Sequence, residues 1–267
     1  MRPEHPQGAG EGLPFYQPVG DELTVFEHCH RTRLPLLLKG PTGCGKSRFV
    51  EHMAARLGRP LVTVACHDDT SATDLLGRFL IEGGDTVWVD GPATRAVRQG
   101  AILYLDEIAE ARPDVLVVIH PLTDHRRSLV VDRHDELIPA PAGFMLVASF
   151  NPGYTQGFKG LKPSTRQRFV GLSFDYPAPE LEMQIVAGEA GVDAKLARRL
   201  VKLGQRLRAL DELGVAEGAS TRLLVDAAQL IRDGLPPRLA GRVAIVEPLT
   251  DEAEVRQALG ELVDLAL

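Results

Sequence analysis

The stretch LLLKGPTGCGKSRFVEHMAARLG, residues 36–58, carries the strongest structural signal in the chain. An apolar run, a glycine-rich turn and an amphipathic tail follow one another, and this order predicts a strand, a loop and a helix. Residues 40–47 fit the phosphate-binding pattern G-x-x-x-x-G-K-[ST] in the strand-to-helix context that its mechanism requires. The apolar residues of the tail recur on one helical face, so we expect this helix to pack on a sheet.

The chemistry of this loop points to ATP and Mg²⁺ as cofactors. Glycines let backbone N–H groups curl around a phosphate at the positive end of the helix dipole. Lys46 is expected to reach the β- and γ-phosphates, and the Ser47 hydroxyl to bind Mg²⁺. The predicted nucleotide-binding residues of the loop are Gly40, Pro41, Thr42, Gly43, Cys44, Gly45, Lys46 and Ser47.

A second apolar stretch, AILYLDE at residues 101–107, ends in two carboxylates. Asp106, at the end of the predicted strand, is expected to hold Mg²⁺ through water. Glu107 is then the predicted base that polarises an attacking water. Taken alone, an Asp-Glu pair here is more often an ordinary strand end, and the upstream phosphate loop is what favours the catalytic interpretation.

Three further positions have both a catalytic and a structural interpretation. Asn151 ends the run FMLVASFN and either orients the attacking water and senses the γ-phosphate, or forms a turn before a proline. Arg166 and Arg168, in KPSTRQRF, form surface salt bridges or supply an arginine finger to a neighbouring subunit; we prefer Arg168, which abuts an apolar strand. Arg222, in GASTRLL, is a surface residue or reaches across a cleft to the γ-phosphate.

The order of apolar segments predicts an α/β fold with a parallel five-stranded sheet flanked by helices. The five predicted strands are Leu34–Lys39, Pro60–Cys66, Ala101–Asp106, Phe144–Phe150 and Arg168–Phe174. Helical periodicity without strand signals follows over residues 179–233. The sequence therefore predicts three parts: a flexible lead at 1–13, a nucleotide-binding core at 14–177 and a small helical domain at 178–267. Two inserts of the core, 79–89 and 126–141, are predicted to project from the sheet as hairpins.

Composition limits the classes of function. The chain has 267 residues, a net charge of −6 and a pI of about 5.8, a balance that gives no support to nucleic-acid binding. Three cysteines without metal-ligand spacing favour a reducing cytoplasm. No apolar run approaches the ~20 residues of a membrane span, and the N-terminus lacks the apolar core of a signal peptide. We expect a cytoplasmic protein without membrane insertion.

In order and spacing, these motifs resemble an AAA+ ATPase. The resemblance equates residues 40–47 with Walker A, 101–107 with Walker B, Asn151 with sensor 1 and Arg222 with sensor 2, and Arg166 or Arg168 with the arginine finger. DLLGRFL and VDGPATRAVRQGAILYLDEIAEARPDV resemble the MoxR branch, whereas PFYQPVGDE, LTDHRRSL, GLKPSTRQRF and AIVEPLTDEAEVRQAL are most similar to its CbbQ/NorQ/NirQ subfamily.

This resemblance implies a homo-oligomeric ring, usually hexameric, whose helical lid packs against the next subunit. It implies that the two hairpin inserts face the pore or a partner. A CbbO-type partner with a von Willebrand A domain is implied, together with a client enzyme. CbbQ-type members reactivate Rubisco by expelling inhibitory sugar phosphates, and NorQ- and NirQ-type members activate nitric oxide reductase. The phrases favour Rubisco, although no residue chemistry separates the two clients.

Three other classes share part of this pattern. A small-molecule kinase also has a phosphate loop and a lid, but needs no Asp-Glu pair poised for water. A nucleotide-dependent scaffold is disfavoured by Glu107. A DNA-translocating motor is disfavoured by the acidic pI and by the balanced charges of the DRHD segment at residues 132–135.

Overall fold

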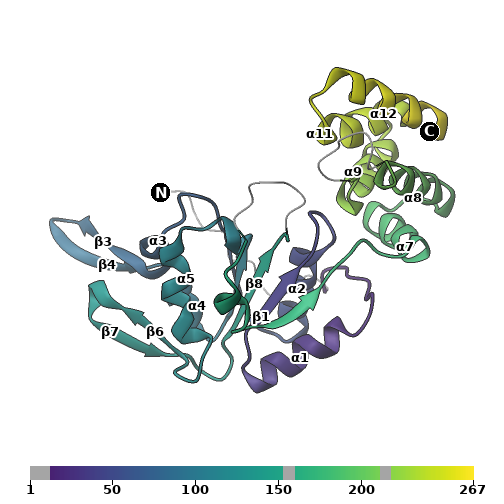
Figure 1. Cartoon of the computed structure of the whole chain (residues 1–267). Helices are drawn as coiled ribbons and strands as arrows, with labels where there is room; N and C mark the ends of the chain where they lie inside the picture. The colour runs from purple at the N-terminus through teal and green to yellow at the C-terminus, as the bar shows by residue number, and fades with distance from the viewer. Residues whose placement is uncertain (1–12, 153–159, 211–217) are drawn as a thin grey trace.

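Parallel strands form the centre of the computed structural model, which describes residues 13–152, 160–210 and 218–267 (Figure 1). Except for residue 13, the predicted flexible lead at 1–13 lies outside these described residues. The sheet order is β2-β5-β8-β1-β9, and every neighbouring pair is parallel. The strands are β1 (Leu36–Lys39), β2 (Leu61–Ala65), β5 (Ile102–Asp106), β8 (Met145–Phe150) and β9 (Val170–Ser173). The predicted five-stranded parallel sheet is therefore confirmed.

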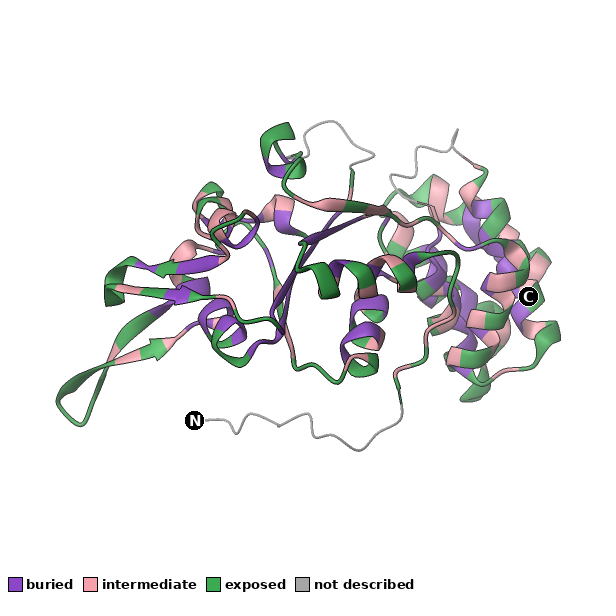
Figure 2. Ribbon diagram, turned by 90° about the horizontal axis from the view of Figure 1, so that it is seen from below, coloured by how far each residue is buried: buried purple, intermediate pink, exposed green. Residues whose placement is uncertain are grey.

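Alternating residues of the central strands fill two separate apolar cores. Leu36, Leu38 and Tyr104 pack with helices α1 (Glu22–Thr32) and α2 (Lys46–Arg56) on one face. Leu37 and Leu103 pack on the other face with α3 (Ala72–Leu76), α4 (Pro92–Gln99) and α5 (Pro113–Ile119). Figure 2 shows the central strands buried between these layers, except for the half-buried last residues of β1 and β5. Continuous apolar runs are the expected sequence of strands covered on both faces.

The edge strands depart from that pattern. β2 and β9 alternate between half-buried and exposed residues because each has a neighbour on one side only. The predicted strand Arg168–Phe174 starts too early. Backbone bonds from Arg168 N to Thr165 O and from Phe169 N to Arg166 O close a turn, so pairing begins at Val170. Arg168 consequently lies in the turn after α6 (Pro163–Arg166) and not in the strand.

Both predicted hairpins are present at the end of the molecule away from the C-terminal helices (Figure 1). The first is β3 (Gly77–Glu82) with β4 (Asp85–Asp90), and the second is β6 (Ser128–Val131) with β7 (Glu136–Pro139). Trp88 of β4 stacks on His134 of the second hairpin, with ring centroids 4.9 Å apart and planes 6° apart. The two hairpins are thus in direct contact.

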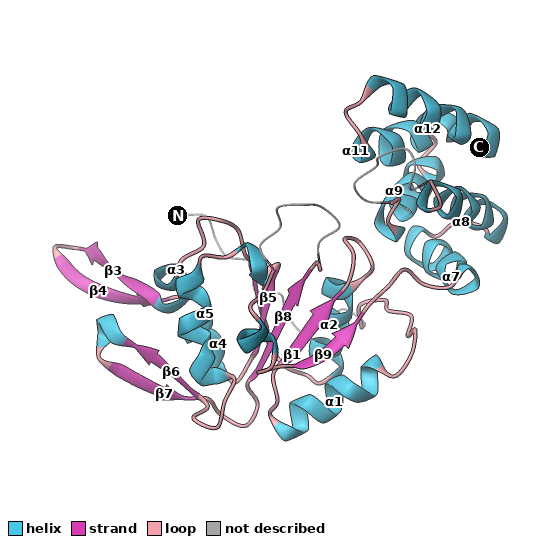
Figure 3. Cartoon of the chain, viewed as in Figure 1, coloured by secondary structure: helices cyan, strands magenta, loops and turns pink. Residues whose placement is uncertain are grey.

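The C-terminal region is helical, as predicted, and has an apolar core of its own (Figure 3). Its helices are α7 (Pro179–Ala190), α8 (Ala194–Arg208), α9 (Thr221–Arg232), α10 (Pro237–Gly241), a π-helical turn (Arg242–Val246), α11 (Glu247–Leu249) and α12 (Ala253–Ala266). Short 3₁₀ turns elsewhere cover Ile108–Glu110, His120–Leu122 and Asp132–His134. No helix within the described ranges is both long and apolar enough to cross a membrane.

Candidate active site

The phosphate loop at residues 40–47 joins β1 to α2. Gly43 and Gly45 have φ angles of +69° and +97°, a region that glycine enters without steric cost. Lys46 is buried, and its Nζ donates hydrogen bonds of 2.8 Å to the carbonyl oxygens of Gly40 and Pro41. These bonds place the ammonium group across the loop. The loop therefore has the backbone shape and the positive charge that a polyphosphate needs.

Hydroxyl groups surround the Asp106 carboxylate. Ser47 Oγ donates to Oδ2 at 3.2 Å, Tyr104 OH donates to Oδ1 at 2.7 Å, and Ser149 Oγ also donates to Oδ1. Burial and the nearby Asp106 charge raise the pKa of Tyr104 above its ordinary value, so the phenol remains a donor at neutral pH. A carboxylate beside a serine hydroxyl at the end of a phosphate loop is the donor set that suits Mg²⁺ bound to ATP.

Glu107 follows Asp106 in a left-handed backbone conformation, with φ +53° and ψ +46°. Such a conformation is uncommon for a residue with a Cβ, and it is found preferentially at functional sites. The backbone N–H of Glu107 donates to Ser149 Oγ at 3.0 Å. Ser149 therefore contacts both acidic residues: it donates to the carboxylate of Asp106 and accepts from the backbone of Glu107.

Sequence reasoning missed Tyr104 and Ser149. Tyr104 lies two residues before Asp106 on β5, and side chains two apart in a strand point to the same face. Ser149 is the only polar residue in the run FMLVASF of residues 144–150. The sequence contains both residues, but their contact with Asp106 depends on β8 lying next to β5, and spacing alone does not reveal that strand order.

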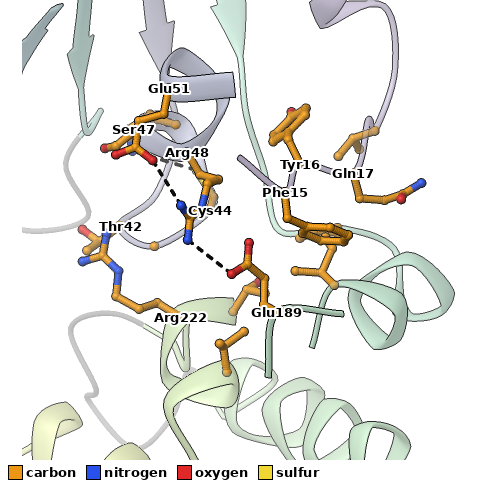
Figure 4. A pocket seen from close by; sticks show the side chains of 18 of the residues that line it. Phe15, Tyr16, Gln17, Thr42, Cys44, Ser47, Arg48, Glu51, Glu189 and Arg222 are labelled. Carbon is orange, nitrogen blue, oxygen red and sulfur yellow. Dashed lines mark hydrogen bonds and ion pairs between the residues drawn. The ribbon is translucent and has the colours of Figure 1, made fainter. Parts of the chain in front are cut away.

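Asn151 and Arg222 both lie beside the phosphate loop, although only Arg222 is among the described residues that line the cleft. Asn151 follows β8, and its Nδ2 donates to Thr42 Oγ1 at 3.3 Å. Arg222 lies in the first turn of α9 and extends toward the loop beside Thr42 (Figure 4). The structure thus brings together the phosphate loop, the acidic pair, Asn151 and Arg222.

Arg166 and Arg168 are not brought to this site. Neither belongs to the described residues that line the cleft, and both are exposed. Arg168 Nη1 donates to the carbonyl oxygen of Ser164 at 2.7 Å, which restricts its side chain.

The site lies in a cleft of about 560 Å³ between the sheet and the C-terminal helices (Figure 4). One wall comes from Phe15, Tyr16 and Gln17, a segment expected to be ordered but not to line a site. Tyr16 OH donates to Glu22 Oε1 at 2.9 Å, and Phe15 packs over Gly188 of α7. The cleft is large enough for a nucleotide, because ligand pockets commonly measure roughly 300–1,000 Å³.

Two family models match the chain. The AAA domain of the dynein-related subfamily matches residues 35–169, which run from just before β1 to the residue before β9. The CbbQ/NirQ/NorQ C-terminal model matches residues 182–266, within the C-terminal helices.

Curated relatives match over nearly the whole chain. NorQ of Paracoccus denitrificans is 59% identical and covers 97% of each chain. The denitrification regulatory protein NirQ of Pseudomonas aeruginosa is 58% identical, covering 96% of this chain and 98% of its own. CbbQ of Hydrogenophilus thermoluteolus is 55% identical over 92% of each chain.

Solved structures share the fold at low identity. A point mutant of RuvB from Thermotoga maritima has a TM-score of 0.56 at 16% identity, covering 92% of this chain and 71% of its own. A putative ATPase from Cytophaga hutchinsonii has a TM-score of 0.51 at 18% identity, covering 92% and 89%.

Replacing Ser149 tests the geometry of the acidic pair. Ser149→Ala removes a donor to Asp106 and the acceptor of the Glu107 N–H, whereas Tyr104→Phe removes a donor to Asp106 and a hydrogen bond with Ser47 Oγ but leaves the Glu107 N–H its acceptor. We expect Ser149→Ala to lower Mg²⁺-dependent ATP turnover by about 10- to 100-fold, the usual effect of losing a group that orients a metal ligand. Tyr104→Phe should have the smaller effect. Steady-state phosphate release over a Mg²⁺ titration, with thermal melts of each variant, measures both; unchanged turnover in Ser149→Ala contradicts the assignment.

Proposed function

Because the chain belongs to the CbbQ/NirQ/NorQ family of AAA+ ATPases, we propose that a ring of its copies hydrolyses ATP to remodel and activate a client enzyme. The observation that carries this proposal is the meeting of Lys46, the Asp106–Glu107 pair and Arg222 in one cleft. Arg222 comes from the C-terminal helices, whereas Lys46 begins α2 and the acidic pair lies at the end of β5. A nucleotide held there contacts both parts of the chain, here taken as a core at 14–177 and a lid at 178–267.

In the proposed reaction, Lys46 would bind the β- and γ-phosphates, while Ser47 and Asp106 would hold the metal, Asp106 through water. Bound Mg²⁺ would neutralise charge on the phosphate oxygens. Glu107, in its left-handed turn, is among the residues that line the cleft, and we assign it the role of accepting a proton from the attacking water. Asn151 orients that water, and Arg222 contacts the γ-phosphate. The fit of the residues to Mg-ATP rests on the three hydroxyls around Asp106 and the two left-handed glycines.

We infer a ring, which we take to be hexameric, and the position of the two arginines supports this inference. Arg168 is exposed, held by Ser164, and absent from the described lining of its own cleft. We therefore assign it as a finger that reaches the nucleotide of the neighbouring subunit, with Arg166 as the alternative. An arginine donated in this way stabilises transition-state charge.

We propose that the two hairpins form the surface that contacts the partner and the client and transmits the conformational change driven by ATP. Ile81 is 80% exposed and Phe79 is 48% exposed at the far end of the molecule, although large apolar side chains are usually buried. Trp88 has a structural role, since it stacks on His134 and packs on the apolar core. We propose that Phe79 and Ile81 contact a CbbO-type partner with a von Willebrand A domain, or the client itself.

For the client we propose nitric oxide reductase, with Rubisco as the alternative. The sequence phrases favour Rubisco, whereas the relatives named NorQ and NirQ have identities of 59% and 58% against 55% for CbbQ. We place the reaction in the cytoplasm. The three cysteines are free and buried, and burial raises the pKa of Cys44 in the loop, which fits a reducing compartment.

Glu107→Gln tests the assignment of the base. The variant keeps Asp106 and the loop, so ATP should bind as in the wild type. Hydrolysis should be slower by at least ~10²-fold, the lower end of the contribution of a positioned base. Calorimetric binding and phosphate release measure the two effects separately. Wild-type turnover would remove Glu107 from the mechanism.

Mixed rings test whether the finger acts on a neighbour. Arg168→Ala supplies intact acidic pairs, and Glu107→Gln supplies intact fingers. Neither variant should hydrolyse ATP alone, but a mixture should recover part of the activity, since some interfaces then hold both groups. If Arg168→Ala is fully active and Arg166→Ala is inactive, the finger is Arg166.

The client and the output surface are tested together. Phe79→Ser combined with Ile81→Ser should leave basal phosphate release within about two-fold and lower client activation at least ten-fold, because truncating an exposed anchor weakens binding and not chemistry. Val117→Ser, at a valine of α5 that is 66% exposed, is the matched control. Nitric oxide reductase and inhibited Rubisco are assayed in parallel. Activation of Rubisco alone would reverse the client assignment. Full client activation by the double variant would show that Phe79 and Ile81 are not the surface that contacts the partner or client.

A further inference from the structure

The C-terminal helices contain a buried ion pair next to the cleft. The Glu182 side chain on α7 has no exposed surface. Arg208 of α8 binds it through two bonds, Nη1 to Oε2 at 2.9 Å and Nη2 to Oε1 at 2.5 Å. Thr221 Oγ1 of α9 donates to Oε1 at 2.6 Å. One carboxylate therefore joins three helices.

This pair fixes the start of α9, the helix that carries Arg222. Arg208 Nε donates to the carbonyl oxygen of Ala219 at 2.6 Å, and Ser220 then caps the helix. Burying two charges costs desolvation free energy that apolar packing would avoid, so stability alone is a weak reason for such a pair. The directional bonds of a guanidinium instead hold one geometry, and here that geometry sets where α9 begins.

The same arginine connects to the phosphate loop. Its guanidinium carbon lies 4.2 Å from the centroid of the Tyr176 ring, in the segment between β9 and α7. Tyr176 OH donates to the carbonyl oxygen of Thr42 at 3.1 Å. A continuous set of contacts thus runs from the loop through Tyr176 and Arg208 to the start of α9.

The loop and α9 also touch directly. A Cβ placed on Gly43 would lie 2.6 Å from Ser220 Oγ and 3.3 Å from the Cβ of Arg222. No side chain fits between them. A movement of the loop backbone at Gly43 would therefore act directly on the first turn of α9.

We propose that Tyr176, Arg208 and Glu182 are positioning residues that couple the phosphate loop to α9, so that a nucleotide in the loop orders Arg222 against its γ-phosphate. This inference rests on the proposed role of Arg222 in ATP hydrolysis. None of the three residues needs to touch the nucleotide. Each acts through the helix start that it holds.

Tyr176→Phe tests the coupling with the smallest change, because it keeps the ring under Arg208 and removes only the hydroxyl bonded to Thr42. We expect kcat for ATP hydrolysis to fall about five-fold or more, at the lower end of typical coupling between sites, with KM changed less than two-fold. In an Arg222→Ala background, the same substitution should have no further effect on kcat, because residues acting through one another are not additive.

Hydrogen exchange gives a readout independent of turnover. Adding a non-hydrolysable ATP analogue to the wild type should protect the first turn of α9, and Tyr176→Phe should lose most of that protection while still binding the analogue. Arg208→Lys keeps the charge but not the two-pronged bond, and should behave in the same way. Arg199→Lys is the matched control: it lies on the same helix and donates to the carbonyl oxygens of Ala266 and Leu267, away from the cleft.

The outcomes separate this inference from the proposed function. If Arg222→Ala lowers kcat but Tyr176→Phe and Arg208→Lys keep both wild-type kcat and protection of α9, the coupling is overturned and the role of Arg222 stands. If Tyr176→Phe lowers kcat equally with and without Arg222, its effect does not pass through α9, and the coupling is again overturned. If Arg222→Ala turns over ATP like the wild type, both the role of Arg222 and the coupling fail, whereas the Glu107 assignment is judged by its own variant.

Discussion

The arrangement of the site depends on the hydrogen bonds that the Asp106 carboxylate accepts. Its hydroxyl partners come from three places in the sequence: the start of α2, β5 itself and β8. Hydrogen bonds to a charged group contribute about 1.5–3 kcal/mol each to the stability of the fold. The strand order brings the hydroxyls to Asp106, and their bonds to its charge in turn stabilise that strand order. Without β8 beside β5, Ser149 could not reach Asp106, and the left-handed turn at Glu107 would lose its acceptor.

Local patterns predicted most of the fold. Five strands, two hairpins and the C-terminal helices follow from apolar periodicity and turn residues, which act over a few positions. The predicted strand Arg168–Phe174 begins two residues before the observed β9, because the turn that delays pairing is held by backbone bonds that no composition signal marks. The residues of the loop and the acidic pair were predicted from a motif whose chemistry is strict. Tyr104 and Ser149 were not, since their meaning depends on which strands are neighbours.

The ion pairs of this chain differ in how strongly they can hold neighbouring elements together. Arg48 of α2 and Glu189 of α7 meet at 3.2 Å across the cleft, but the arginine is about half exposed, and such pairs contribute little. Arg98 of α4 bonds Asp90 of the first hairpin at 2.8 Å and Glu136 of the second at 2.9 Å, so it ties both to one helix. Together with the stacked rings of Trp88 and His134, this bridge joins the two hairpins to each other and to α4.

The cleft lies between the sheet, which has an apolar core on each face, and the C-terminal helices, which have an apolar core of their own. Bodies with separate cores can change their relative position without losing buried apolar surface within either one. The contacts that link them at the cleft include the Arg208 guanidinium over the Tyr176 ring, Phe15 over Gly188 and Gly43 against Ser220. A partly exposed ion pair between Arg48 and Glu189 adds to them. A ligand can shift such an arrangement only by binding one position better than another. A triphosphate that needs Lys46 from one body and Arg222 from the other has this preference built into its contacts.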